Sequence, residues 1–125
     1  MAEPVAEVLR AVLAGERPPR AVETLGLRIT TTDASVSMRI DYPSPNPPVI
    51  TFSLADLATG LLRATQHAED PALWGAIVLM VDSFDFDDID SGDGQLLLEG
   101  LYDLSNGGEL SGETVEVAHR RATRA

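Results

Sequence analysis

The stretch from Asp70 to Gly108 most constrains what this chain can fold into. It reads DPALWGAIVLMVDSFDFDDIDSGDGQLLLEGLYDLSNGG and contains the only tryptophan and the densest apolar runs, IVLMV and LLL. Between those two runs lies the densest group of acidic residues in the chain. Apolar runs of this kind are stabilised by burial, whereas clustered carboxylates need solvent or a cationic partner. The fold therefore has to place a hydrophobic core beside an acidic rim.

Two residues at the beginning of this stretch predict a helix. Asp70 is a favourable N-cap, and Pro71 suits the first helical position. Apolar residues then recur at helical spacing from Trp74 to Val81, or as far as Phe84. The alternative is that the hexapeptide AIVLMV forms a central strand. The capping signal and the spacing favour a nearly fully buried helix.

The rest of the chain predicts an α+β domain. Helical spacing and capping residues predict four further helices, at about 4–14, 54–68 and 94–105 and from Ser111 onward. A short helical turn, RAVETLG, ends at Gly26. β-branched residues predict three strands, LRITTT, SVSMRIDY and VITF, of which the first two form a hairpin. We expect a single domain over residues 1–125, a small antiparallel sheet of about three strands with about five helices packed mainly on one face.

The charge is unevenly distributed. Residues 64–119 contain thirteen acidic residues and no lysine or arginine, and the whole chain has a net charge of −11. Such a field repels nucleic acid and anionic lipid and favours a basic protein partner or a cation. All nine basic residues are arginines, a usage typical of bacterial genomes rich in G and C.

Composition also excludes several classes of protein. No apolar run approaches the roughly 18 residues of a membrane span, and the N-terminal residues do not have the pattern of a signal peptide. The absence of cysteine excludes disulfides, thiolate catalysis and zinc–thiolate sites. We expect a cytoplasmic protein with no nucleic-acid partner, no membrane partner and no cofactor.

The acidic group supplies the candidate partner-binding residues, together with one tyrosine. They are Asp82, Asp85, Asp87, Asp88, Asp90, Asp93 and Tyr102. Tyrosine and tryptophan are enriched at binding hot spots, but Trp74 shares an apolar stripe with Ile77, which favours a place in the core. Tyr102 remains open between the two roles.

Catalysis is not indicated. Paired carboxylates act in catalysis when their environments differ, whereas these aspartates are expected to be solvated together in a polar loop. His67 and His119 do not lie in a metal-binding spacing, and no nucleophile elbow or phosphate-binding loop is present. The sequence therefore predicts a protein that is not an enzyme.

A calcium site is the alternative use of the acidic group. The segment 88–99, DIDSGDGQLLLE, resembles an EF-hand loop that carries one extra residue. Its candidate ligands are Asp88, Asp90, Asp93 and Glu99. Glycine stands at position 5 and aspartate at position 6, which reverses the EF-hand pattern. A solvated acidic turn is favoured, in which Asp93 caps the following helix.

From Asp56 to Glu109 the chain resembles small acidic bacterial proteins, some of which are encoded beside toxins as their immunity partners. The shared features are DLATGLL, a helix that begins with Asp-Pro and contains tryptophan, an acidic loop, and LLEGLYDLSNG. The leading hypothesis is a non-enzymatic acidic protein-binding module, such as an immunity or antitoxin-like inhibitor of a basic partner. The alternatives are a calcium-binding protein and a structural subunit of an oligomer.

Overall fold

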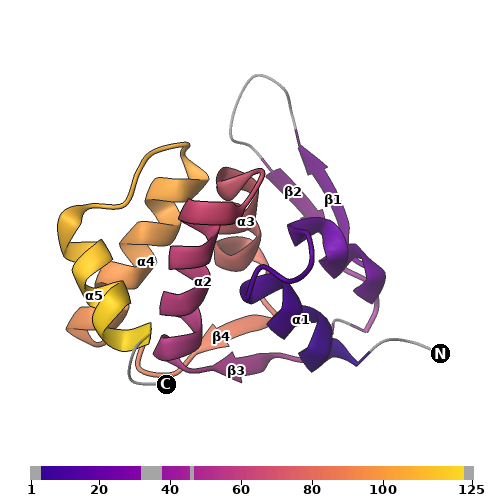
Figure 1. The fold of residues 1–125 in the computed structure, drawn as a ribbon. Helices are drawn as coiled ribbons and strands as arrows, with labels where there is room; N and C mark the ends of the chain where they lie inside the picture. Colours follow the sequence, from indigo (N-terminus) through magenta and orange to yellow (C-terminus); the bar gives the residue numbers. More distant parts are fainter. Residues whose placement is uncertain (1–3, 32–37, 46, 123–125) are drawn as a thin grey trace.

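A central helix organises the computed structural model, which describes residues 4–31, 38–45 and 47–122. Helix α2 runs through the middle, with α4 and α5 on one side and α1 and the β1–β2 hairpin on the other (Figure 1). The elements in chain order are α1 (Val5–Leu13), the 3₁₀ helix η1 (Pro19–Leu25), β1 (Arg28–Thr31), β2 (Met38–Asp41), β3 (Ile50–Phe52), α2 (Leu54–His67), α3 (Pro71–Met80), β4 (Phe84–Phe86), α4 (Gly92–Ser105) and α5 (Gly112–Ala122). The predicted α+β class is confirmed.

Helix α2 begins where its capping residue predicts. The Oγ of Ser53 accepts a hydrogen bond from the backbone N–H of Asp56 at 3.1 Å, which satisfies one of the free donors of the first turn. The apolar stripe of α2 is buried, including Leu57 and Leu61 at 0% exposure. A Cβ at Gly60 would collide with the carbonyl oxygen of Leu13. The glycine therefore lets the end of α1 cross α2 closely.

The segment after Asp70 is a helix, α3, as predicted, and the alternative of a central strand at AIVLMV is wrong. The Oδ1 of Asp70 accepts from the N–H of Leu73 at 3.0 Å, with proline at the first helical position. Trp74 is buried in the core, and its Nε1 donates to the carbonyl oxygen of Val12 at 3.0 Å. The helix ends at Met80, before the predicted limit, because Val81 is extended and the chain then turns into β4.

The predicted single antiparallel sheet is corrected to two separate pairs of strands. Strands β1 and β2 form the expected antiparallel hairpin, in which Ile29 faces Ile40. The residues that separate the two predicted strands, Asp33 and Ala34, lie outside the described residues. Strand β3 does not join this hairpin. It pairs in parallel with β4, a strand that lies inside the predicted acidic loop.

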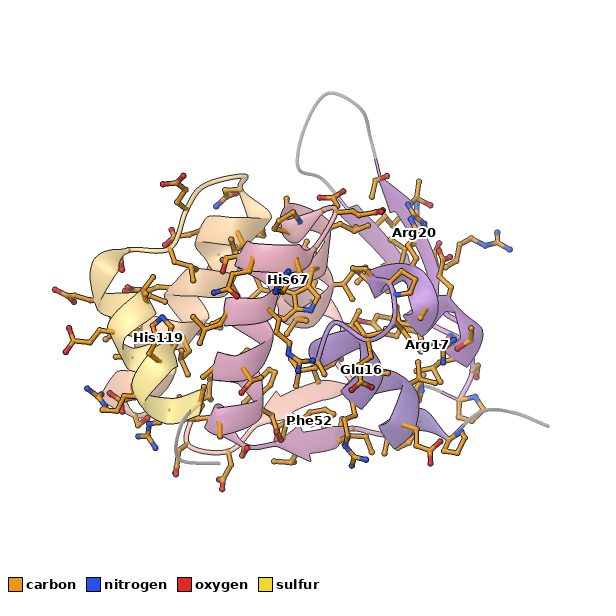
Figure 2. All side chains as sticks on the ribbon, viewed as in Figure 1. Glu16, Arg17, Arg20, Phe52, His67 and His119 are labelled. Atoms are coloured by element: carbon orange, nitrogen blue, oxygen red, sulfur yellow. The ribbon has the colours of Figure 1, made fainter. Side chains whose placement is uncertain are left out.

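Aromatic packing explains why β3 pairs with β4. The ring centroid of Phe52 lies 6.0 Å from that of Phe84 and 6.2 Å from that of Phe86. All three rings are buried, and Figure 2 shows Phe52 on β3 below α2. Alternation along β4 turns both phenylalanines inward and the intervening Asp85 outward.

Helices α4 and α5 complete the fold. Ser111 caps α5 as predicted, since its Oγ accepts from the N–H of Thr114 at 3.2 Å. The prediction that Asp93 caps α4 is wrong. The cap is Ser91, whose Oγ accepts from the N–H of Gly94 at 3.0 Å, while Asp93 lies in the first turn of the helix.

Candidate functional site: the acidic segment

Residues 82–93, called the acidic segment below, are held in place by β4 at their start. The N–H of Ile50 donates to the carbonyl oxygen of Ser83 at 2.8 Å, and the N–H of Asp87 donates to that of Phe52 at 2.9 Å. Thr51 Oγ1 donates to Asp85 Oδ2 at 2.9 Å. The first half of the predicted loop is therefore a strand fixed by its neighbour.

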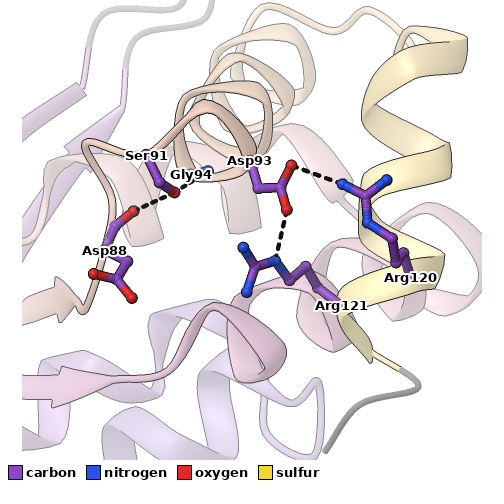
Figure 3. A network of polar contacts seen from close by, with 6 residues as sticks. All are labelled: Asp88, Ser91, Asp93, Gly94, Arg120 and Arg121. Atoms are coloured by element: carbon purple, nitrogen blue, oxygen red, sulfur yellow. Dashed lines mark hydrogen bonds and ion pairs between the residues drawn. The ribbon is translucent and has the colours of Figure 1, made fainter.

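A capped turn holds the second half. The carbonyl oxygen of Asp88 accepts from the backbone N–H of Ser91 at 2.9 Å and from its Oγ at 2.7 Å (Figure 3). Gln95 Nε2 donates to the carbonyl oxygen of Ile89 at 2.8 Å. Asp88 has a φ of 58°, a left-handed conformation that aspartate adopts more readily than most residues. The backbone beneath the aspartates is thus determined by local hydrogen bonds.

Five of the six candidate aspartates are exposed to solvent: Asp82, Asp85, Asp87, Asp88 and Asp90. Within residues 4–31, 38–45 and 47–122, none of them forms an ion pair with an arginine. The sequence has no arginine between Arg63 and Arg120. The negative charges of these five aspartates therefore face the solvent and any molecule that approaches. This is the arrangement that a cationic partner would meet.

Asp93 differs from the other five aspartates because it forms ion pairs with two arginines of α5. Its Oδ1 accepts from Arg120 Nη2 at 2.7 Å, and its Oδ2 accepts from Arg121 Nε at 2.8 Å (Figure 3). The pKa of Asp93 is lowered below its ordinary value, most by the hydrogen bond from Arg120 and next by the one from Arg121. The charge of this carboxylate is therefore already balanced by two arginines, unlike the charges of the other five aspartates.

The candidate ligands of the calcium alternative do not come together in the structure. Asp93 is occupied by arginines, and Glu99 is an exposed residue of α4, more than one turn beyond Asp93. In the described parts of the chain, no three histidine, cysteine, aspartate or glutamate side chains come together in a group able to hold a metal ion. Asp88, Asp90, Asp93 and Glu99 are therefore not brought together as a metal site.

Tyr102 does not lie beside the acidic segment. It is 51% exposed, as an interface residue must be, but it occupies the last turns of α4, whereas Asp93 occupies the first. Nine residues of α-helix separate them by about 13 Å along the axis. Tyr102 is therefore available for contact at the opposite end of α4.

Sequence reasoning missed a cleft of about 800 Å³ on another part of the molecule. Its lining comes from the α1–η1 connection, the start of η1, the C-terminal part of α2, the α2–α3 connection and the first turn of α3. These are residues 14–20, 63–64, 66–70 and 73–74. His67, an exposed residue at the end of α2, belongs to this lining. The available signal was the Glu16–Arg20 run, ERPPR, but only the packing of α1 against α2 brings it to Arg63 and His67.

Comparison of the chain with protein-family models, with curated proteins and with solved structures finds no match. Among the helices that the structure describes, none is both long enough and apolar enough to cross a membrane.

Proposed function

We propose that the protein is a non-enzymatic binding module that presents its acidic segment to a basic partner protein, as an immunity or antitoxin-like inhibitor presents itself to a toxin. The observation that carries this proposal is the set of five exposed aspartates, which have no arginine partner in the described residues. The proposal places the protein in the cytoplasm, which agrees with the absence of cysteine.

The backbone under these carboxylates supports a binding role, because it is already ordered. Phe84 and Phe86 anchor β4 in the core, and the Asp88–Ser91 hydrogen bonds fix the turn. A surface that is ordered before binding loses less conformational entropy when the partner arrives. The carboxylates accept hydrogen bonds from lysine and arginine side chains, with a bidentate geometry available to arginine.

Electrostatics give the proposal a kinetic signature. A group of like charges on one partner speeds the approach of an oppositely charged protein, and salt reduces that effect. We therefore expect the association rate to fall steeply as ionic strength rises, while the dissociation rate changes less. A partner that binds through an apolar surface instead would show little dependence on salt.

The test begins with pull-downs from bacterial lysate at low and high salt, followed by purification of the basic protein that is retained at low salt. Surface plasmon resonance then compares the wild type with the triple variant Asp85→Asn, Asp87→Asn and Asp88→Asn. We expect the triple variant to associate at least about tenfold more slowly at low salt.

A matched control separates the acidic segment from the net charge of the protein. The variant Glu99→Gln, Glu109→Gln and Glu116→Gln removes the same amount of charge from exposed positions outside residues 82–93. We expect this control to keep most of the wild-type association rate. Equal losses in both triple variants would show that only net charge matters, and the absence of a basic partner at either salt concentration would remove the support for the proposal.

A further inference from the structure

The cleft beside α2 has the size of a small-molecule site. Its volume of about 800 Å³ falls within the usual range of roughly 300–1,000 Å³ for such sites. Glu16, Arg17 and His67, all labelled in Figure 2, belong to the lining of this one cleft. No residue of the acidic segment lines the cleft, so the inference drawn from it stands apart from the proposed function.

Charged residues of both signs line this cleft. They are Arg17, Arg20, Arg63, Glu16, Glu69 and Asp70. Arg20 pairs with Glu23 at 3.0 Å, Asp70 caps α3, and Arg17 has a partner as well. The chain as a whole is strongly acidic, whereas this cleft has as many arginines as acidic residues in its lining.

Three of the lining charges keep capacity for a ligand. The guanidinium of Arg63 donates from Nη1 to the carbonyl oxygen of Ala14 at 3.1 Å, and it carries further N–H donors. Within the described residues, neither Glu16 nor Glu69 is ion-paired with Arg63 or with another arginine. Opposite charges that share a cleft without pairing can each bind the complementary charge of one ligand.

Part of the cleft lining is apolar. Leu73, Trp74 and Ala64 contribute to the lining, and the hydrogen bond from Trp74 Nε1 to Val12 fixes the indole. His67 follows Arg63 by one helical turn, so both belong to the same face of α2. A ligand that fits has both charges and an apolar body between or beside them.

We propose that this cleft binds a small zwitterion with an apolar body, namely an amino acid or a short peptide with free ends. Arg63 binds the carboxylate with the help of His67. Glu16 and Glu69 bind the ammonium group, and the apolar side chain lies against Leu73 and Trp74.

The test uses Trp74 as a reporter, because it is the only tryptophan and it lines the cleft. Fluorescence and amide chemical shifts are followed during titration with L-leucine, with the tripeptide Ala-Leu-Ala, and with its N-acetylated, C-amidated and doubly blocked forms. We expect the free compounds to bind saturably and each blocked end to lower the affinity about tenfold. The doubly blocked peptide should not bind. Tighter binding of leucine than of the tripeptide assigns the site to amino acids, and the reverse assigns it to peptides.

Two variants assign the charges. Arg63→Gln should lower the affinity for the free tripeptide about tenfold without lowering the affinity for the C-amidated form any further. Glu69→Gln should likewise lower the affinity for the free tripeptide but not that for the N-acetylated form. The controls are Arg28→Gln and Glu116→Gln, two exposed residues outside the cleft. Circular dichroism checks the fold of Arg63→Gln, and Glu69→Gln provides the test by itself if Arg63→Gln unfolds. The inference is overturned if no free compound saturates at millimolar concentration, if blocked and free peptides bind equally, or if the variants match their controls.

Discussion

The Nε of Arg121 donates a hydrogen bond to the Oδ2 of Asp93 across 2.8 Å and so joins the last turn of α5 to the first turn of α4. Arg120 completes the arrangement by donating to the other carboxylate oxygen at 2.7 Å. Each residue also lies at the helix end where its charge is favourable, the acid near an N-terminus and the arginines near a C-terminus. One carboxylate thus connects two helices through residues that lie 28 positions apart in the sequence.

The first prediction concerns the stability that this connection provides. Asp93→Asn should lower the melting temperature, because it leaves Arg120 and Arg121 without their carboxylate. Asp90→Asn, three residues earlier, removes an exposed charge with no described ion pair and should leave the melting temperature unchanged or slightly higher. Thermal unfolding followed by circular dichroism compares the two. Equal shifts would mean that Asp93 contributes no more than an ordinary surface acid.

The second prediction concerns pH. The pKa of Asp93 is lowered in the folded protein, whereas in the unfolded chain an aspartate titrates near about 3.9. The stabilisation is therefore fully present above that value and is lost as the pH falls through the lower, folded pKa. The difference in free energy of unfolding between wild type and Asp93→Asn should be constant from about pH 7 to pH 5 and should shrink below about pH 4. Denaturant unfolding at each pH measures it, and a difference that changes near neutrality would point to another group.

The third prediction concerns the turn under the acidic segment. A Cβ at Gly94 would collide with the carbonyl oxygens of Asp88 and Ile89, whereas a Cβ at Gly92 would meet no atom within 4 Å. Gly94→Ala should therefore cost about 1–3 kcal/mol of stability, as overpacking generally does. Gly92→Ala should be neutral or stabilising by up to about 1 kcal/mol. Denaturant unfolding provides both values, and a neutral Gly94→Ala would show that the turn rearranges easily.

The helices could be predicted from sequence because their signals are local. Ser53, Asp70 and Ser111 all cap the helices that the sequence assigns to them. The parallel pairing of β3 with β4 could not be predicted in the same way. Phe84–Phe86 shows only one period of alternation inside an acidic run, and the residue that pairs with Asp85 is Thr51, 34 positions earlier.

The sequence indicates which acidic residues are candidates for the site, but not which of them are paired with arginines. Five aspartates are exposed as expected, but the sequence gives no reason to separate Asp93 from them, because the arginines that bind it lie a helix away. The cleft depends on the same kind of non-local contact. Its charges come from the α1–η1 connection, η1, α2 and the α2–α3 connection, and the close crossing of Leu13 with Gly60 brings the first of these segments to α2.

The last prediction concerns repulsion within the acidic segment. Asp85→Asn combined with Asp87→Asn and Asp88→Asn should leave the fold intact and raise the melting temperature slightly, because like charges in close sequence repel one another. Asparagine at position 85 can still accept the hydrogen bond from Thr51 Oγ1. Salt should raise the melting temperature of the wild type by screening this repulsion.

Salt also weakens the attraction between Asp93 and the two arginines, so its two effects on stability oppose each other. Asp93 is a single, partly buried acid, whereas the chain as a whole carries a net charge of −11, so repulsion should dominate. The triple variant should gain less from salt than the wild type does. Differential scanning calorimetry from low to high ionic strength measures both. A triple variant that melts below the wild type would mean that these aspartates accept stabilising hydrogen bonds beyond the one from Thr51, and the acidic segment would then be a structural turn rather than a free binding surface.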